Sequence, residues 1–227
     1  MSFTKSKTLL RAIAYASFGV LSAAIIVSAH RHLLDFSEAE AWGFVTGGWG
    51  VWLTVEKSIW TWPVGLANNV FFFVLFFRAK LFADMALQIV YIILGVLGWY
   101  WWLFGGEHRS KLPVAAASRA MVVYTGISVA ISTFVLTIYL TRVGDSAPFG
   151  DAITTALSLG GQFLLSKKLV DNWYFWIVAD VIYVWLYISK GLFLTSALYA
   201  IFLLMCFAGL ARWRASLPAA PAPAIVA

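Results

Sequence analysis

The stretch LFADMALQIVYIILGVLGWYWWLF, residues 81–104, holds one charged side chain, Asp84, among its 24 residues. A helix needs roughly 20 apolar residues to cross the hydrocarbon core of a bilayer. A second stretch of the same kind, LFLTSALYAIFLLMCFAGLARW, follows at residues 192–213. These two segments predict that the chain is embedded in a membrane.

The composition agrees with this prediction. Hydrophobic residues make up 62% of the 227 residues and charged residues 11%, and the mean hydropathy is +0.87. Soluble domains have about 45–50% apolar and about 25% charged residues, so a water-soluble fold, a disordered chain and a nucleic-acid-binding module are excluded. The single cysteine, Cys206, rules out a disulfide framework, and the three histidines lie outside the apolar runs. We therefore expect no metal site, no cofactor and no catalytic group.

Eight apolar segments predict an all-α integral membrane protein. They cover residues 8–29, 41–55, 60–77, 81–104, 118–141, 149–166, 173–189 and 192–213. Segments 41–55 and 149–166 are rich in Gly, Thr and Ser, which suits close helix packing in lipid. The first segment could also be read as a signal peptide. We favour a retained helix, because its apolar stretch is longer than such signals usually have.

The chain contains an internal repeat at an offset of 111 residues. Residues 45–102 align with 156–213 without a gap, and 12 of the 58 pairs are identical, where about four are expected by chance. Identical pairs include Lys57/Lys168, Trp62/Trp173 and Trp102/Trp213. One span lies between the copies, so equivalent helices should cross the membrane in the same direction.

The repeat predicts a 3+1+3 helix plan with one extra N-terminal helix. Its parts are the extra transmembrane helix (1–35), the first three-helix bundle (40–104), the linker helix (118–141), the second three-helix bundle (148–213) and a disordered tail (215–227). Two similar bundles can rock about a site at their interface, which gives alternating access.

The distribution of Lys and Arg predicts the orientation. Of the 16 basic residues, 11 fall on the side that holds both termini and five on the other side. The positive-inside rule then places both termini in the cytoplasm.

Polar side chains inside the spans are costly and point to function. Asn69 and Asp180 occupy equivalent positions near the middle of their spans. Gln88 and Tyr91 share a helix face, and Asp180 shares one with Tyr183 and Tyr187. Asp180 could contact a substrate, or it could be structural and pair with Lys190 or a backbone group.

Six of the 12 tryptophans fall into two groups that bear on function. Trp99, Trp101, Trp102 and Trp213 lie at span ends, where an interfacial aromatic belt explains them. Trp176 and Trp185 lie deeper. Their rings could stack on a planar heterocycle, and a cationic ring would add cation–π attraction.

Six short motifs stand out in the spans. They are N-x-x-F-F-F from Asn68, A-K-L-F-A-D at 79–84, L-Q-x-x-Y at 87–91, G-W-Y-W at 98–101, W-x-x-W at 173–176 and L-Y-x-x-K-G-L-F-L-T at 186–195. Together they resemble the PnuC family of bacterial vitamin transporters, and the nicotinamide riboside branch most of all. The resemblance implies a SWEET-like fold in the bacterial inner membrane and facilitated diffusion of nicotinamide riboside. It also implies that a separate cytoplasmic nicotinamide riboside kinase drives uptake by phosphorylation, which feeds NAD biosynthesis.

The family resemblance places the substrate between the bundles, next to eight residues. These are Gln88, Tyr91, Trp173, Trp176, Asp180, Tyr187, Lys190 and Thr195. Asn69 and Trp185 join them as candidates from their own positions in the spans.

Other functions stay open at this point. The same fold could carry thiamine, riboflavin or a deoxynucleoside. A seven-helix retinal photoreceptor would need Lys190 as its Schiff-base lysine, but Lys190 lies at a helix junction. An integral membrane enzyme is disfavoured, since no His/Asp/Glu or Ser/His cluster at catalytic spacing falls within the spans. Lipid is an expected partner and nucleic acid is not; a homo-oligomer is left open.

Overall fold

The computed structural model describes residues 2–33, 37–78, 80 and 82–217, and all its regular elements are helices. They are α1 (Ser2–His30), α2 (Glu38–Val55), α3 (Thr61–Arg78), α4 (Phe82–Phe104), η1 (Glu107–Arg109), α5 (Arg119–Arg142), α6 (Pro148–Ser166), α7 (Asn172–Ser189) and α8 (Phe193–Arg214). The all-helical prediction is confirmed. Most of the predicted tail, residues 218–227, lies outside the described part.

Four of the helices are long and apolar enough to cross a membrane. The qualifying segments are Ala12–His30, Asp84–Phe104, Arg119–Arg142 and Thr195–Arg214, in α1, α4, α5 and α8. In each of the other four long helices, α2, α3, α6 and α7, polar side chains lower the hydropathy: Glu38 and Glu40 in α2, Asn68 and Asn69 in α3, Asp151 and Gln162 in α6, and Asn172 and Asp180 in α7.

The chain divides into two compact units, residues 1–49 and 50–227. In the first unit, the Trp49 indole N–H donates to the Ser22 hydroxyl at 3.2 Å, and the Phe18 ring meets the Trp49 ring edge-on at 4.8 Å. Ser37 and Glu40 form a capping box that fixes the start of α2.

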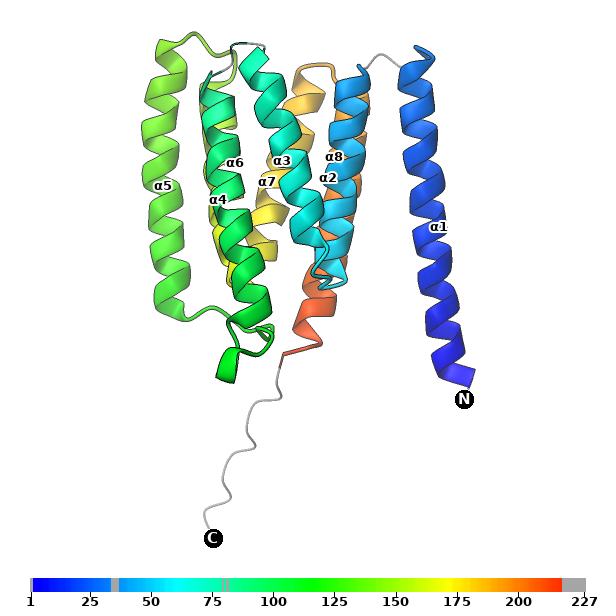
Figure 1. Cartoon of the computed structure of the whole chain (residues 1–227). Helices are drawn as coiled ribbons and strands as arrows, with labels where there is room; N and C mark the ends of the chain where they lie inside the picture. The colour runs from blue at the N-terminus through cyan, green and yellow to red at the C-terminus, as the bar shows by residue number, and fades with distance from the viewer. Residues whose placement is uncertain (1, 34–36, 79, 81, 218–227) are drawn as a thin grey trace. The chain divides into compact units, whose positions relative to one another are not determined.

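In the second unit, α3 to α8 run side by side (Figure 1). Helix α3 packs on α4, α4 on α6, α6 on both α5 and α7, and α7 on α8. Helix α6 therefore lies at the centre of this unit. Its many small residues, including Ala152, Ala156, Gly160 and Gly161, are buried and allow this close packing.

The helix bounds reproduce the 111-residue offset. Helix α3 begins at Thr61 and ends at Arg78, and α7 begins at Asn172 and ends at Ser189. Both ends are therefore 111 residues apart. The grouping of these helices into two bundles around a linker stays a prediction.

The core lies at the end of this unit where α4, α6 and α8 finish, and it consists mainly of tryptophan. Trp62, Trp102, Trp173 and Trp213 are each at most 3% exposed. Trp62 meets Trp102 edge-on with ring centres 5.3 Å apart, and the equivalent rings of Trp173 and Trp213 do the same at 5.6 Å. The interfacial-belt prediction is therefore wrong for Trp102 and Trp213, which form the core.

Two reciprocal hydrogen bonds join the repeats in this core. The Trp102 indole N–H donates to the Leu165 carbonyl at 3.1 Å, and the Trp213 indole N–H donates to the Thr54 carbonyl at 3.0 Å. Trp102 and Trp213 are equivalent, and so are Thr54 and Leu165. Each repeat therefore gives the other the same bond, as expected for two units related by a two-fold axis.

We predict that replacing either of two equivalent glycines, Gly98 and Gly209, by alanine destabilises the fold, because each packs directly against a core tryptophan ring. A Cβ at Gly98 would lie 2.2 Å from the Trp62 ring, and a Cβ at Gly209 would lie 2.4 Å from the Trp173 ring. Overpacking of this kind costs about 1–3 kcal/mol. Gly98→Ala and Gly209→Ala should each lower the thermal midpoint of the purified protein. Gly126→Ala in α5, which meets no atom within 4 Å, is the control, and equal midpoints in all three variants would contradict the packing argument.

Candidate functional site

One face of α7 carries four of the ten predicted site residues, together with Tyr183. Trp173, Trp176, Asp180, Tyr183 and Tyr187 follow one another at helical spacings of three and four. The opposite face consists of exposed side chains. These are Tyr174, Val178, Val181, Trp185 and Ile188. Since apolar side chains exposed on a membrane helix face lipid, α7 has a lipid face and an inner face.

Three tyrosine rings from α7 and α8 form a cluster on the inner side. The Tyr199 ring lies 4.6 Å from the Tyr183 ring and 5.1 Å from the Tyr187 ring, and Tyr183 and Tyr187 stack at 6.0 Å. Such a group of aromatic faces can contact a flat ring, above all a cationic one.

Asp180 is 5% exposed and its Oδ2 accepts from the Cys206 thiol at 3.3 Å. Of the alternatives left open for Asp180, the pairing with Lys190 is not the one found. Ten residues of helix separate the two by about 15 Å, and Lys190 pairs with another residue. A thiol is a weak hydrogen-bond donor, so the Asp180 carboxylate can still accept further hydrogen bonds.

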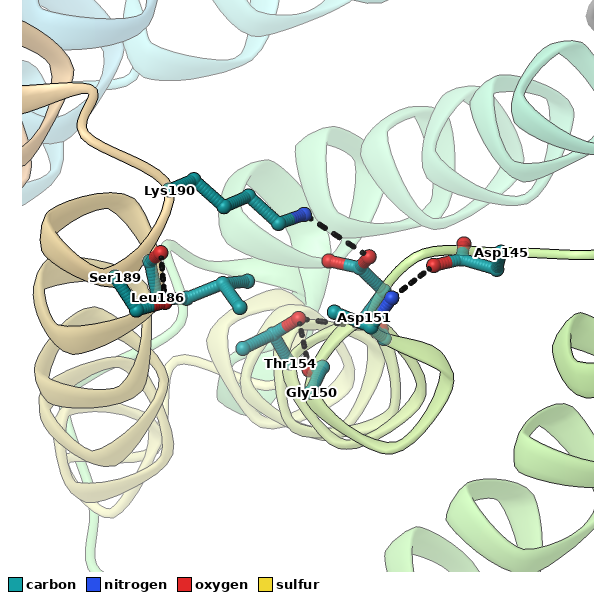
Figure 2. Close-up of polar contacts among 8 residues, drawn as sticks. Asp145, Gly150, Asp151, Thr154, Leu186, Ser189 and Lys190 are labelled. Carbon is teal, nitrogen blue, oxygen red and sulfur yellow. Dashed lines mark hydrogen bonds and ion pairs between the residues drawn. The ribbon is translucent and has the colours of Figure 1, made fainter.

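Lys190 lies at the C-terminal end of α7, beyond the inner face. Its ammonium lies 3.6 Å from the Asp151 carboxylate, in a half-buried ion pair that joins the end of α7 to the start of α6 (Figure 2). The Asp145 carboxylate beside it accepts from the Ala147 N–H at 2.7 Å, and the Thr154 hydroxyl donates to the Gly150 carbonyl at 2.9 Å.

Helix α4, which belongs to the first repeat, contributes two of the predicted site residues. Gln88 and Tyr91 are partly buried on α4, which packs against α6. The Tyr91 hydroxyl interacts with Ser158 of α6, and so does the Tyr183 hydroxyl of α7. Ser158 therefore links the two repeats through two tyrosines. Thr195, on α8, is also partly buried.

Three predicted residues lie apart from this group. Trp173 is 1% exposed and packed in the tryptophan core, whereas Trp185 is 66% exposed on the lipid face of α7. Asn69 is partly buried on α3. Within the described residues, no hydrogen bond or ring contact joins Asn69 to the tyrosine cluster.

The two repeats differ in polarity where the site residues gather. Phe72 and Phe76 of α3 stack at 5.6 Å, just as the equivalent Tyr183 and Tyr187 of α7 do. The two repeats thus share the stacked rings, and only the second repeat carries hydroxyl groups on them. On α6, Thr154 and Ser158 likewise stand where the first repeat has Gly43 and Gly47.

This contrast between equivalent positions could have identified Tyr183, Tyr199, Thr154 and Ser158 from the sequence. They were not among the ten predicted site residues, although Tyr183 and Tyr199 lie on polar stripes visible in the sequence. The hydroxyl groups are unnecessary for packing, since phenylalanine packs in the same way in the other repeat. They mark the second repeat as the polar side of the site.

A groove of about 650 Å³ lies elsewhere, between α5 and α6. It is lined by Ser118, Met121, Tyr124, Ser128, Leu159 and Phe163, among others, and by none of the ten predicted site residues. Among the described residues, no group of three His, Cys, Asp or Glu side chains could hold a metal ion.

Comparison with known proteins decides the family. The model of the family described as nicotinamide mononucleotide transporter matches residues 37–215. This chain belongs to that family. It is therefore a membrane transporter and not an enzyme.

Relatives of this transporter include two with known cargo. The nicotinamide riboside transporter PnuC of Escherichia coli K12 is 27% identical over 206 residues, covering 79% of this chain and 86% of its own. The riboflavin/roseoflavin transporter RibM of Streptomyces davaonensis is 23% identical over 167 residues, covering 71% and 77%. A crystal structure of the vitamin B3 transporter PnuC shares the fold, with a TM-score of 0.68, 20% identity and 91% of both chains covered.

Proposed function

We propose that this transporter carries nicotinamide riboside across the bacterial inner membrane by facilitated diffusion. The observation that carries the proposal is the inner face of α7 and α8, where tyrosine rings lie between two carboxylates, Asp180 and Asp151. The pyridinium ring of nicotinamide riboside is flat and cationic, so it suits aromatic faces and a carboxylate. The ribose hydroxyls and the carboxamide suit hydroxyl and amide side chains such as Tyr91 and Gln88.

The proposed binding set is narrower than the sequence alone indicates. It consists of Gln88, Tyr91, Trp176, Asp180, Tyr187, Lys190 and Thr195, to which we add Tyr183, Tyr199 and Ser158. Trp173 is left out because its ring is enclosed in the core, and Trp185 because its ring faces outward. Asn69 is kept as a residue that a movement of α3 would bring to the substrate.

In the proposed mechanism, α2–α4 and α6–α8 form the two bundles, α5 links them, and they rock to expose the site alternately. The tryptophan end, with the greater number of basic residues, faces the cytoplasm with both termini. Phosphorylation by a separate cytoplasmic kinase traps the product and draws further substrate inward. Among the described residues, the spans contain no row of arginines that would sense voltage.

Riboflavin is the second candidate cargo, because RibM is a relative of similar coverage. Its ring system is larger and neutral, so it would gain less from Asp180. Thiamine, which has a cationic ring, stays a third candidate. The family and the transport mechanism are the same for all three.

The first prediction about function concerns the cargo. Calorimetric titration of the detergent-purified protein should show saturable binding of nicotinamide riboside and none of riboflavin, thiamine or nicotinic acid. Binding of one of the other vitamins alone would replace the proposed cargo and leave the transporter fold in place.

The second prediction compares two tryptophans in the interior of the α7 segment, Trp176 and Trp185. Trp176→Ala should weaken nicotinamide riboside binding about tenfold or more, because base–aromatic stacking contributes about 1–3 kcal/mol. Trp185→Ala is the matched control: the same substitution on the same helix, at a side chain that is 66% exposed. Equal affinities of the two variants in the titration would remove Trp176 from the site.

The third prediction tests the hydroxyl groups of the second repeat. The double variant Tyr183→Phe/Tyr187→Phe should fold normally, because Phe72 and Phe76 stack in the same way. Its affinity should fall about tenfold, since each hydrogen bond contributes roughly 0.5–1.5 kcal/mol. Tyr139→Phe on α5, whose ring is 48% exposed, should bind like the wild type. An unchanged affinity in the double variant would show that substrate does not contact these hydroxyls.

A further inference from the structure

Three lysines gather at the tryptophan end of the second unit: Lys57, Lys111 and Lys168. Lys57 and Lys168 are equivalent in the repeat and follow the ends of α2 and α6. Both adopt the left-handed backbone conformation, with φ of 58° and 56°. Glycine is favoured at such helix ends, and Gly144 and Gly191 fill this role after α5 and α7. The backbone conformation therefore does not explain why both positions hold lysine. We infer that the lysine side chains have a role of their own.

The two ammonium groups flank the paired core indoles. Lys168 Nζ donates to the Leu112 carbonyl at 2.7 Å and lies 4.5 Å from the centre of the Trp102 ring. Lys57 Nζ donates to the carbonyl of Arg212, the residue before Trp213, at 3.5 Å. The Trp102 and Trp213 rings are 5.8 Å apart. One ammonium group thus reaches this centre from each repeat, and Lys111 adjoins it as the chain neighbour of Leu112.

The charges at this centre are unbalanced. Burial lowers the pKa of Lys168, and the positive charges of Lys57 and Lys111 lower it further. Three carboxylates of the described residues lie on this side. Glu56 forms an ion pair with Arg212, Asp171 accepts from the Ala117 N–H at 2.6 Å, and Glu107 is exposed on η1 and forms no ion pair with a lysine among the described residues. The three lysines therefore have no carboxylate in ion-pair contact and repel one another, and an anion among them would relieve that repulsion.

The unused donors suit a phosphate group. An ammonium group has three N–H bonds, and Lys57 and Lys168 each donate one to a carbonyl in the contacts above. Lys111 is exposed and makes no hydrogen bond or ion pair with the described residues. We propose that Lys57, Lys111 and Lys168 form a binding site for a phosphate group, carried either by a free phosphate compound or by a lipid headgroup.

General attraction of exposed lysines to anionic lipid would not require this arrangement. Lys57 and Lys168 are partly buried, are held against carbonyl groups and stand at equivalent points of the two repeats. A phosphate bound between them would tie the repeats together at this end. It would therefore slow any transport cycle in which the repeats separate here, whatever the cargo.

The test uses the full-length protein with two sources of phosphate. In detergent, inorganic phosphate is titrated calorimetrically, with sodium chloride at matched ionic strength as the reference. In nanodiscs, the thermal midpoint is compared between phosphatidylcholine alone and phosphatidylcholine mixed with phosphatidylglycerol. The variants are Lys57→Gln, Lys168→Gln and Lys111→Gln; the last removes an exposed side chain and should fold normally. Lys80→Gln is the matched control, because Lys80 is also left-handed, with φ of 60°, but lies at the other end of α3.

We expect each of the three variants to weaken phosphate binding about tenfold, as for the loss of one charge-assisted hydrogen bond, while Lys80→Gln binds like the wild type. Binding in detergent would identify a free phosphate compound as a ligand. Stabilisation by phosphatidylglycerol alone, lost in the same variants, would identify a lipid headgroup. The proposal is overturned if neither source has an effect, or if Lys80→Gln reduces the effect as much as the three variants do.

Discussion

The structure depends on the pair of hydrogen bonds that the two repeats exchange through Trp102 and Trp213. A buried indole N–H needs an acceptor, and most carbonyl groups of a helical membrane protein are already used within helices. Carbonyls in the last turn of a helix fall outside the regular ladder and can accept from other groups; those of Thr54 and Leu165 accept from the Lys57 and Lys168 N–H at 2.9 and 2.8 Å and from an indole N–H as well. Thr54 and Leu165 lie in the last turns of α2 and α6. Each repeat therefore provides the acceptor that the other repeat's tryptophan needs.

Around this symmetric centre the contacts of the two repeats diverge. Arg212 of the second repeat forms an ion pair with Glu56 of the first. The equivalent positions are Trp101 and Lys167, where the Lys167 ammonium lies 3.3 Å from the centre of the Trp101 ring. The same contact between repeats is thus made by an ion pair on one side and a cation–π interaction on the other. Packing has preserved the geometry of the contact while its chemistry has changed. In the same way, α7 has Tyr183 and Tyr187 where α3 has Phe72 and Phe76, and both pairs of rings stack.

Length and apolarity in the sequence were sufficient to predict the helices. Seven of the eight predicted spans begin and end within three residues of the observed helices, and only the start of the first, residue 8 against Ser2, differs more. The site was less predictable, because helical spacing shows which residues share a face but not which neighbour that face meets. Trp176 and Trp185 look alike in sequence, yet one packs against Gly161 and the other is exposed. A tryptophan at the end of a span can lie either at the membrane interface or in the core, and the sequence does not distinguish the two. Trp102 and Trp213 were assigned to the interface, but they lie in the core.

The free energy needed to separate the helices differs between the two ends of the second unit. At the tryptophan end, separation of the repeats would expose aromatic rings that bury roughly 150–250 Å² each, and would break two buried hydrogen bonds. At the other end, Lys190, Asp151 and Asp145 are at least partly exposed already, and water can replace an exposed ion pair at a cost of about 0–1 kcal/mol. Water and a polar substrate therefore reach the tyrosine cluster more easily from the Lys190 end in this conformation. In the proposed alternating-access cycle the tryptophan end must also open, and the interactions that hold the repeats together there would oppose that step.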